Sequence, residues 1–180
     1  MPRYVALFRG INVGKAKRIA MADLRQLLES MGYTDVETLL NSGNAIFEGD
    51  GQAEARHAQL IHDAVVKKLK VHSHVVVKSA NEIAAIIAGN RLSAVANNPS
   101  KLLVAMTNDP NGLKAMASMG KTLWPGETVH VGKHAAYAWC PEGTLKSKAG
   151  VALLTKLADM GTTRNWATLE KIHELLQRSH

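Results

Sequence analysis

The sequence contains a single cysteine, Cys140, so an internal disulfide is excluded and no Cys-x-x-Cys or mixed Cys/His spacing suggests structural zinc. No apolar run approaches the roughly 20 residues that span a bilayer, and the apolar stretch near the start is too short and wrongly flanked for a signal peptide. Aromatic residues make up only 4% of the chain, which leaves few rings for stacking on nucleic-acid bases. We therefore expect a cytoplasmic protein with no membrane partner and no metal site.

What is present is the composition of a folded protein with an uneven charge distribution. With 180 residues, 46% hydrophobic and 21% charged, the chain is long enough for one generous domain or two small units. The formal net charge of +7 favours anionic partners without specifying one. Residues 1–20 carry five cations and no acid, whereas residues 21–50 carry one arginine and six acids. The positive charge is therefore concentrated near the first loop.

The first half of the chain has the pattern strand, helix, strand, strand, helix, strand. The run "YVALF" at Tyr4–Phe8 is typical of a buried strand, and leucines at helical spacing follow it. Residues 41–44, "NSGN", favour a tight turn between two strands, and a second helical pattern over residues 53–69 precedes a β-branched strand at 74–78. In this ferredoxin-like order the third strand lies beside the first, so the loop over residues 9–15 and the "NSGN" turn are expected to be neighbours.

The second half begins after a polar connector that contains Pro99. The runs "KLLVAMT", "ETVHVG" and "HAAYAWC" predict strands, and Asp109 with Pro110 can open a helix between the first two. Two helical patterns close the chain, with "MGTTRNW" between them. We predict an α+β protein with a ferredoxin-like subdomain over residues 1–90. A second, related strand-helix-strand-strand subdomain over residues 91–180 ends in a helical pair, and we expect the two to pack as one compact unit.

Three motifs together resemble the family of domains of unknown function numbered 1697. They are "ALFRGINVGK" at 6–15, "NSGNAIF" at 41–47 and "TTRNWATL" at 162–169, and their order and spacing span nearly the whole chain. The resemblance implies a small bacterial-type cytoplasmic protein of two α/β subunits, the first ferredoxin-like, with no established activity. This chain has Lys15 where members usually place a second glycine, and Ala167 where an asparagine is common, so its ligand preference could differ.

The motif "RGINVGK" has the composition of a phosphate-binding loop without its spacing. A Walker loop needs G-x-x-x-x-G-K-[ST]; here one spacer residue is missing, and the residue after the lysine lacks a hydroxyl. What remains is a nest-like loop of backbone donors between Arg9 and Lys15 that could hold an anion. In the alternative interpretation, Gly10 and Gly14 permit positive φ and Asn12 bonds the loop's own backbone.

The motif "TTRN" also has two interpretations. Thr162, Thr163 or Asn165 can cap the last helix, which alone explains the small polar residues. Capping does not explain Arg164, whose guanidinium suits a bound carboxylate or phosphate and equally an internal acid. The candidate ligand-binding residues are therefore Arg9, Gly10, Asn12, Gly14, Lys15, Ser42, Asn44, Thr163, Arg164 and Asn165.

No motif identifies a reaction or a cofactor. Cys140 has no His/Asp arrangement readable beside it, and we expect it to behave as a small buried hydrophobe. His72 and His74, and His130 and His134, have spacings that can bind metal, but neither pair has a third ligand nearby. The sequence therefore leaves open whether the protein is an enzyme.

Three functions remain compatible with these residues. The preferred one is binding of an anionic small molecule or nucleotide-like ligand at the edge formed by "RGINVGK" and "NSGN". The first alternative is nucleic-acid binding by the basic surface, through a helix-turn-helix formed by the last two helices or by stacking on Tyr4, Phe8 and Phe47, although the RNP signature is missing. The second alternative is a protein interaction module that uses a sheet edge.

Overall fold

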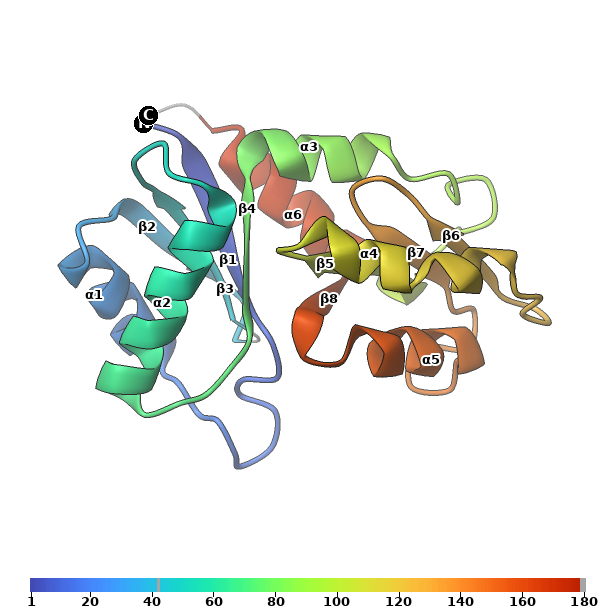
Figure 1. The fold of residues 1–180 in the computed structure, drawn as a ribbon, viewed down its shortest axis with the longest axis horizontal. Helices are drawn as coiled ribbons and strands as arrows, with labels where there is room; N and C mark the ends of the chain where they lie inside the picture. The colour runs from blue at the N-terminus through green and yellow to red at the C-terminus, as the bar shows by residue number, and fades with distance from the viewer. Residues whose placement is uncertain (42, 179–180) are drawn as a thin grey trace. The chain divides into compact units, whose positions relative to one another are not determined.

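The computed structural model describes residues 1–41 and 43–178, which form eight β-strands and six α-helices (Figure 1). The chain divides into two units, the first made of residues 1–80 together with the chain end from Ile172, the second of Asn81–Lys171. The boundary expected from the polar connector, at residue 90, lies inside the second unit. No helix in the described part of the chain combines the length and the apolar character needed to cross a membrane.

The first unit has the ferredoxin-like topology that the sequence predicts. Its elements are β1 (Arg3–Phe8), α1 (Met21–Ser30), β2 (Thr34–Leu39), β3 (Asn44–Glu48), α2 (Glu54–Leu69) and β4 (Val75–Ser79). The strands form an antiparallel sheet in the order β2-β3-β1-β4. Leu7 pairs with Asn44, so the end of β1 lies beside the start of β3. The prediction that the loop after β1 and the turn before β3 are neighbours is confirmed.

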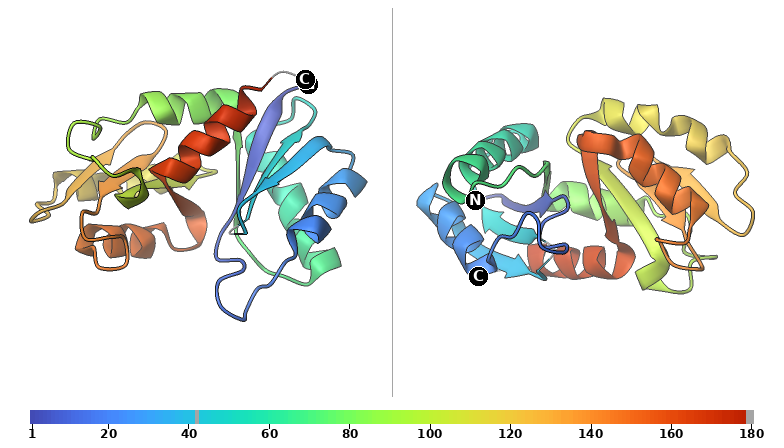
Figure 2. Two further views of the ribbon diagram at one scale, coloured as in Figure 1. Left: turned by 180° about the vertical axis from the view of Figure 1, so that it is seen from behind. Right: turned by 90° about the horizontal axis from the view of Figure 1, so that it is seen from below.

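Helices α1 and α2 cover one face of this sheet and bury a core against it (Figure 2). Side chains alternate between the two faces of a strand, so every second residue of β1, namely Tyr4, Ala6 and Phe8, contributes to this core. Phe47 of β3 joins them, and all three aromatic side chains are buried. These rings are therefore not exposed for stacking on bases.

The second unit repeats the same topology. After α3 (Ala80–Ala88) come β5 (Leu102–Thr107), α4 (Pro110–Ala115), β6 (Thr128–Val131), β7 (Ala136–Trp139), α5 (Lys148–Leu157), β8 (Gly161–Asn165) and α6 (Trp166–Leu176). Short 3-10 turns lie at Pro99–Lys101, Ala117–Lys121 and Ala158–Met160. The sheet is antiparallel with the order β6-β7-β5-β8, which matches the order of the first sheet element for element. The second unit is therefore also ferredoxin-like.

The motif "TTRN" forms the fourth strand of this second sheet, so the expectation of a helix-turn-helix there is wrong. β8 pairs antiparallel with β5 and places Arg164 opposite Val104. The segment is too short to show a helical or strand periodicity in its hydrophobic residues. Its conformation is therefore decided by pairing with β5 and by the preference of threonine for strands. The capping prediction is confirmed for Asn165, whose Oδ1 accepts a hydrogen bond from the N–H of Thr168 at 2.9 Å in the first turn of α6.

Candidate functional site

The loop between β1 and α1, residues 9–20, is held in shape by one asparagine. The side-chain amide of Asn12 donates to the carbonyls of Ile19 at 2.8 Å and Asn41 at 2.7 Å, while its Oδ1 accepts from the N–H of Ile19 at 2.8 Å. The backbone N–H of Asn12 donates to the carbonyl of Lys17 at 3.0 Å. Asn12 thus closes the loop on itself and ties it to the turn before β3.

Four residues of this loop have positive φ angles. Gly10 and Gly14 each have φ of 68°, Asn12 has 57° and Lys17 has 51°. Left-handed residues between right-handed ones turn successive N–H groups toward a common point, which is the geometry of an anion-binding nest. None of the described residues lies within 4 Å of a Cβ added at Gly10 or Gly14, so these positions favour glycine because of φ rather than space.

The outer part of the loop presents cations and main-chain donors to solvent. Lys15, Lys17 and Arg18 are exposed, and Arg18 donates to the carbonyl of Gly14 at 3.0 Å. Within the described part of the chain, neither lysine has an ion-pair partner, and the N–H groups of residues 13–16 have no hydrogen-bond acceptor. The loop therefore offers several donors and two ammonium groups to a ligand.

The other first-unit candidates have contacts inside the protein. Asn44 is fully buried, and its side-chain amide donates to the carbonyl of Leu39 at 2.8 Å, which holds the hairpin together. Arg9 is half-buried, and its backbone N–H donates to the carbonyl of His74 at 3.0 Å. Ser42 lies outside the described residues. Among the described candidates of the first unit, the exposed ones therefore lie in the loop.

The remaining candidates, Thr163, Arg164 and Asn165, lie on β8 in the second unit. Arg164 is only 9% exposed, and its Nη1 donates to the hydroxyl of Thr162 at 2.9 Å and to the carbonyl of Thr163 at 2.7 Å. Burial lowers the pKa of Arg164 to about 10. Both of these hydrogen bonds lie within β8, so the guanidinium contributes to the fold.

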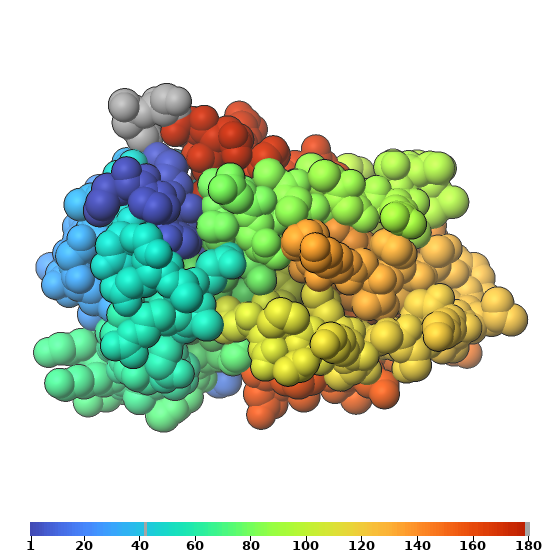
Figure 3. Space-filling view, turned by 45° about the horizontal axis from the view of Figure 1, so that its top comes forward, coloured from blue at the N-terminus to red at the C-terminus, as the bar shows by residue number. Residues whose placement is uncertain are grey.

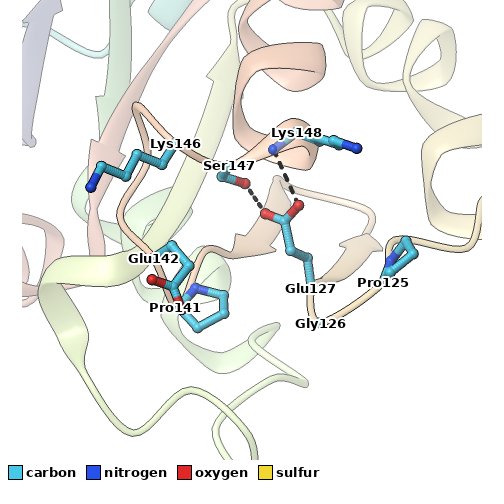
Figure 4. A pocket seen from close by; sticks show the side chains of 8 residues that line it. All are labelled: Pro125, Gly126, Glu127, Pro141, Glu142, Lys146, Ser147 and Lys148. Carbon is cyan, nitrogen blue, oxygen red and sulfur yellow. Dashed lines mark hydrogen bonds between the residues drawn. The ribbon is translucent and has the colours of Figure 1, made fainter.

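A pocket of about 370 Å³ that the sequence did not indicate lies at the start of α5 (Figure 4). The carboxylate of Glu127 reaches into it, accepting hydrogen bonds from the hydroxyl of Ser147 and from the N–H groups of Lys148 at 3.1 Å and Ala149 at 3.3 Å. A helix N-terminus attracts anions, and here the chain's own carboxylate fills that position. The one feature of the sequence that could have indicated this helix start is Ser147, because serine is a common N-cap residue and a helical apolar pattern follows it.

Cys140 packs against the first turn of α5, where its Sγ lies 3.2 Å from the position of a Cβ on Gly150. The thiol is fully buried, as expected from the sequence. Burial raises the pKa of Cys140, so the thiol stays protonated at neutral pH. Among the described residues, no three His, Cys, Asp or Glu side chains gather closely enough to hold a metal ion.

Replacing Asn12 with alanine should lower the free energy of unfolding by about 1–3 kcal/mol, because backbone groups at Ile19 and Asn41 lose their partner. Urea unfolding followed by circular dichroism measures the change. Asn97→Ala is the matched control, since Asn97 is exposed and its side chain makes no hydrogen bond within the described residues. Equal stability of the two variants would show that Asn12 does not hold the loop.

Each unit contains a four-stranded antiparallel sheet, and the two sheets have the same strand order. In each unit a loop joins the first strand to the first helix. The protein is therefore an α+β protein with two ferredoxin-like units in tandem. The chain belongs to the DUF1697 family, described as protein of unknown function, whose model matches residues 1–137. The resemblance suggested by the motifs is thus confirmed, and the match ends before "TTRN".

A similar solved structure is that of the conserved bacterial protein SP0830 from Streptococcus pneumoniae. It has a TM-score of 0.79 and 25% sequence identity, over 98% of this chain and 99% of that chain. The likeness therefore extends over both ferredoxin-like units. A comparison with curated proteins found no match.

Proposed function

We propose that this protein binds a small anionic ligand, such as a phosphate-bearing or nucleotide-like molecule, at the loop that follows β1. The observation that supports the proposal is the exposed segment over residues 13–16, whose main-chain N–H groups have no hydrogen-bond acceptor among the described residues and which carries Lys15, with Lys17 next to it. The first 20 residues contain five cations and no acid, so no carboxylate from this segment competes with a bound anion. Oriented amides combined with cations suit phosphate and carboxylate oxygens.

The loop is organised before any ligand arrives. Asn12 fixes its two ends, and the bond from Arg18 to the carbonyl of Gly14 fixes its outer part. A ligand that meets a preorganised loop does not have to order it, which favours affinity. The exposed side chains available to contact the anion are Lys15 and Lys17, and Arg9 lies at the start of the same loop.

The test is a thermal-shift and calorimetric titration with inorganic phosphate, nucleotides, carboxylates and short RNA. A ligand at about 100 times its dissociation constant should stabilise the protein by roughly 2.7 kcal/mol. We expect Lys15→Gln/Lys17→Gln to bind about tenfold more weakly, which corresponds to a loss of about 1.4 kcal/mol of attraction. The measured quantity is the dissociation constant of each variant for the anion that gives the largest shift.

The matched control is Lys67→Gln/Lys68→Gln, which removes the same charge from two exposed lysines in the last turn of α2. This control should bind the anion as the unmodified protein does. Equal weakening in both double variants would show that only net charge matters and would contradict a loop site. A response confined to RNA, with affinity falling steeply as salt rises, would replace the small-anion proposal by the nucleic-acid alternative.

A further inference from the structure

A basic pocket of about 320 Å³ lies within the second unit between the end of α3 and the β6–β7 hairpin. Figure 3 shows the hairpin, in orange, against α3 and the segment that follows it, in green. The side chains that matter for its chemistry are Arg91, His130, Lys133 and His134, and no residue of the proposed loop site belongs to it. The spacing of His130 and His134 was visible in the sequence, but their meeting with Arg91 was not.

Two short turns carry the basic side chains to this place. The Oδ1 of Asn90 accepts from the N–H of Leu92 at 2.9 Å, which shapes the turn that holds Arg91. In the hairpin, the N–H of Gly132 donates to the carbonyl of Ala135 at 2.9 Å, and this closes the turn that holds the lysine and the outer histidine. The cations therefore come from turns that are fixed by hydrogen bonds.

The aromatic ring of Tyr137 supports the histidine of the pocket. Its hydroxyl is buried and donates to the carbonyl of Ile86 at 2.5 Å, which fixes the ring. The imidazole of His130 stacks on this ring, with centroids 5.9 Å apart and an angle of 15° between planes. A Cβ at Gly89 would come within 2.9 Å of the Tyr137 hydroxyl, so glycine allows α3 to approach. His130 is thus positioned by packing.

The polar atoms of the pocket are largely uncommitted. In the part of the chain that the structure describes, Arg91 and Lys133 have no ion-pair partner and neither ring nitrogen of His130 has a hydrogen-bond partner. The acid that contacts this group is Glu82, whose Oε1 lies 2.9 Å from Nδ1 of His134. Glu82 therefore compensates the outer histidine and leaves the other three basic groups without an anion.

We propose that this pocket binds the phosphate group of a small phosphorylated molecule, with Arg91 and His130 as the recognising side chains. A guanidinium can donate two parallel hydrogen bonds to phosphate oxygens, and a protonated imidazole donates a third. The volume is at the lower end of the range for ligand pockets, which suits a compact phosphomonoester. Lys133, exposed on the hairpin turn, adds a charge at the rim.

The pocket predicts a definite pH dependence of binding. Burial lowers the pKa of His130, and the charge of Arg91 lowers it further, so the imidazole of the empty pocket is neutral at neutral pH. A bound dianion favours the imidazolium and raises this pKa. Binding of a ligand that stays a dianion therefore takes up a proton, and its affinity increases as the pH falls from 8 toward 6. The other charged or titratable groups at the pocket are Lys133, Tyr137 and His134 with its partner Glu82.

The experiment is an NMR titration of the labelled full chain with inorganic phosphate, and with sulfate, which stays a dianion between pH 6 and 8. We expect shifts at the amides of Gly132 and Lys133, and a rise of about one unit in the pKa of His130 when sulfate is bound, equivalent to a tenfold linkage. The His130→Gln variant should lose the pH dependence, and Arg91→Gln should bind about tenfold more weakly, as expected when a charged hydrogen-bond donor is removed.

Two controls separate this site from the loop after β1. Lys114→Gln changes an exposed charge on α4 and should leave the titration unchanged. Lys15→Gln/Lys17→Gln should weaken anion binding at the loop after β1 and leave the response of the His130 signals unchanged. Unchanged hairpin amides at saturating phosphate and sulfate would overturn the proposal. It would equally be overturned if Arg91→Gln and the unmodified protein had the same affinity at the hairpin.

Discussion

Replacing Phe47 with alanine is expected to lower the free energy of unfolding by about 3–5 kcal/mol. The ring is fully buried between the first sheet and its helices. Its centroid lies 5.5 Å from that of Tyr4, 4.4 Å from that of Tyr33 and 5.9 Å from that of His57. Truncation removes one member of a four-ring cluster and leaves a cavity that the flanking rings cannot easily fill.

The polar members of this cluster make the cost larger, because they depend on the packing for their geometry. Nε2 of His57 lies 3.1 Å from the carbonyl oxygen of Asp50 and donates to it, and Nδ1 shares a hydrogen bond of 2.8 Å with the Tyr33 hydroxyl. Burial, together with the charge of Asp50, raises the pKa of Tyr33 to about 12, so the phenol stays neutral. Loss of the Phe47 ring would loosen a buried, hydrogen-bonded network.

Urea unfolding followed by circular dichroism measures this loss. Leu123→Ala is the control, because Leu123 is 93% exposed and its truncation should change stability by no more than about 0.5 kcal/mol. A loss of less than about 1 kcal/mol in Phe47→Ala would mean that the cluster repacks around the missing ring, contrary to the behaviour of well-packed cores.

The second large effect is expected for Gly161→Ala, which should cost about 3 kcal/mol or more through overpacking. Gly161 opens β8 in an extended conformation with φ of −171°, so its backbone angle does not require glycine. Space requires it, because an added Cβ would overlap the carbonyl oxygen of Met106 and lie 2.9 Å from a methyl of Leu157. A backbone oxygen cannot rotate away, so β8 would have to move from β5.

Gly51→Ala provides the matched control for this substitution. None of the described residues lies within 4 Å of a Cβ at Gly51, and its φ is not positive. The same change in composition should therefore alter stability by no more than about 1 kcal/mol, in the stabilising direction if the angles suit alanine. Similar unfolding free energies for the two alanine variants would refute the steric argument at Gly161.

The first unit was largely predictable from its sequence, since its strands and helices have clear periods. Leucines at helical spacing mark α1, and the turn residues at 41–44 mark the hairpin. Once the order of elements was known, topology alone placed the loop after β1 beside that hairpin. The internal bonds of Asn12 also follow from a residue type that bonds nearby backbone.

The second unit was harder because its decisive contacts are distant in sequence. β8 is five residues long and polar, and only pairing with β5 makes it a strand. Arg164 was open to two interpretations from the sequence, because no local pattern encodes its burial or its hydrogen bonds within β8. The pocket at Arg91 and His130 depends on a hairpin returning to a helix end, which no local pattern encodes.

The two units carry the same strand order but join their first strand and first helix differently. In the first unit residues 9–20 form this connection, whereas in the second only Asn108 and Asp109 separate β5 from α4. There Asp109 accepts from the N–H of Asn111 at 2.9 Å and starts the helix at once. The second unit therefore serves as an internal control for the first. Properties that come from the ferredoxin-like topology should occur in both units, whereas properties that come from the long connection should occur only in the first.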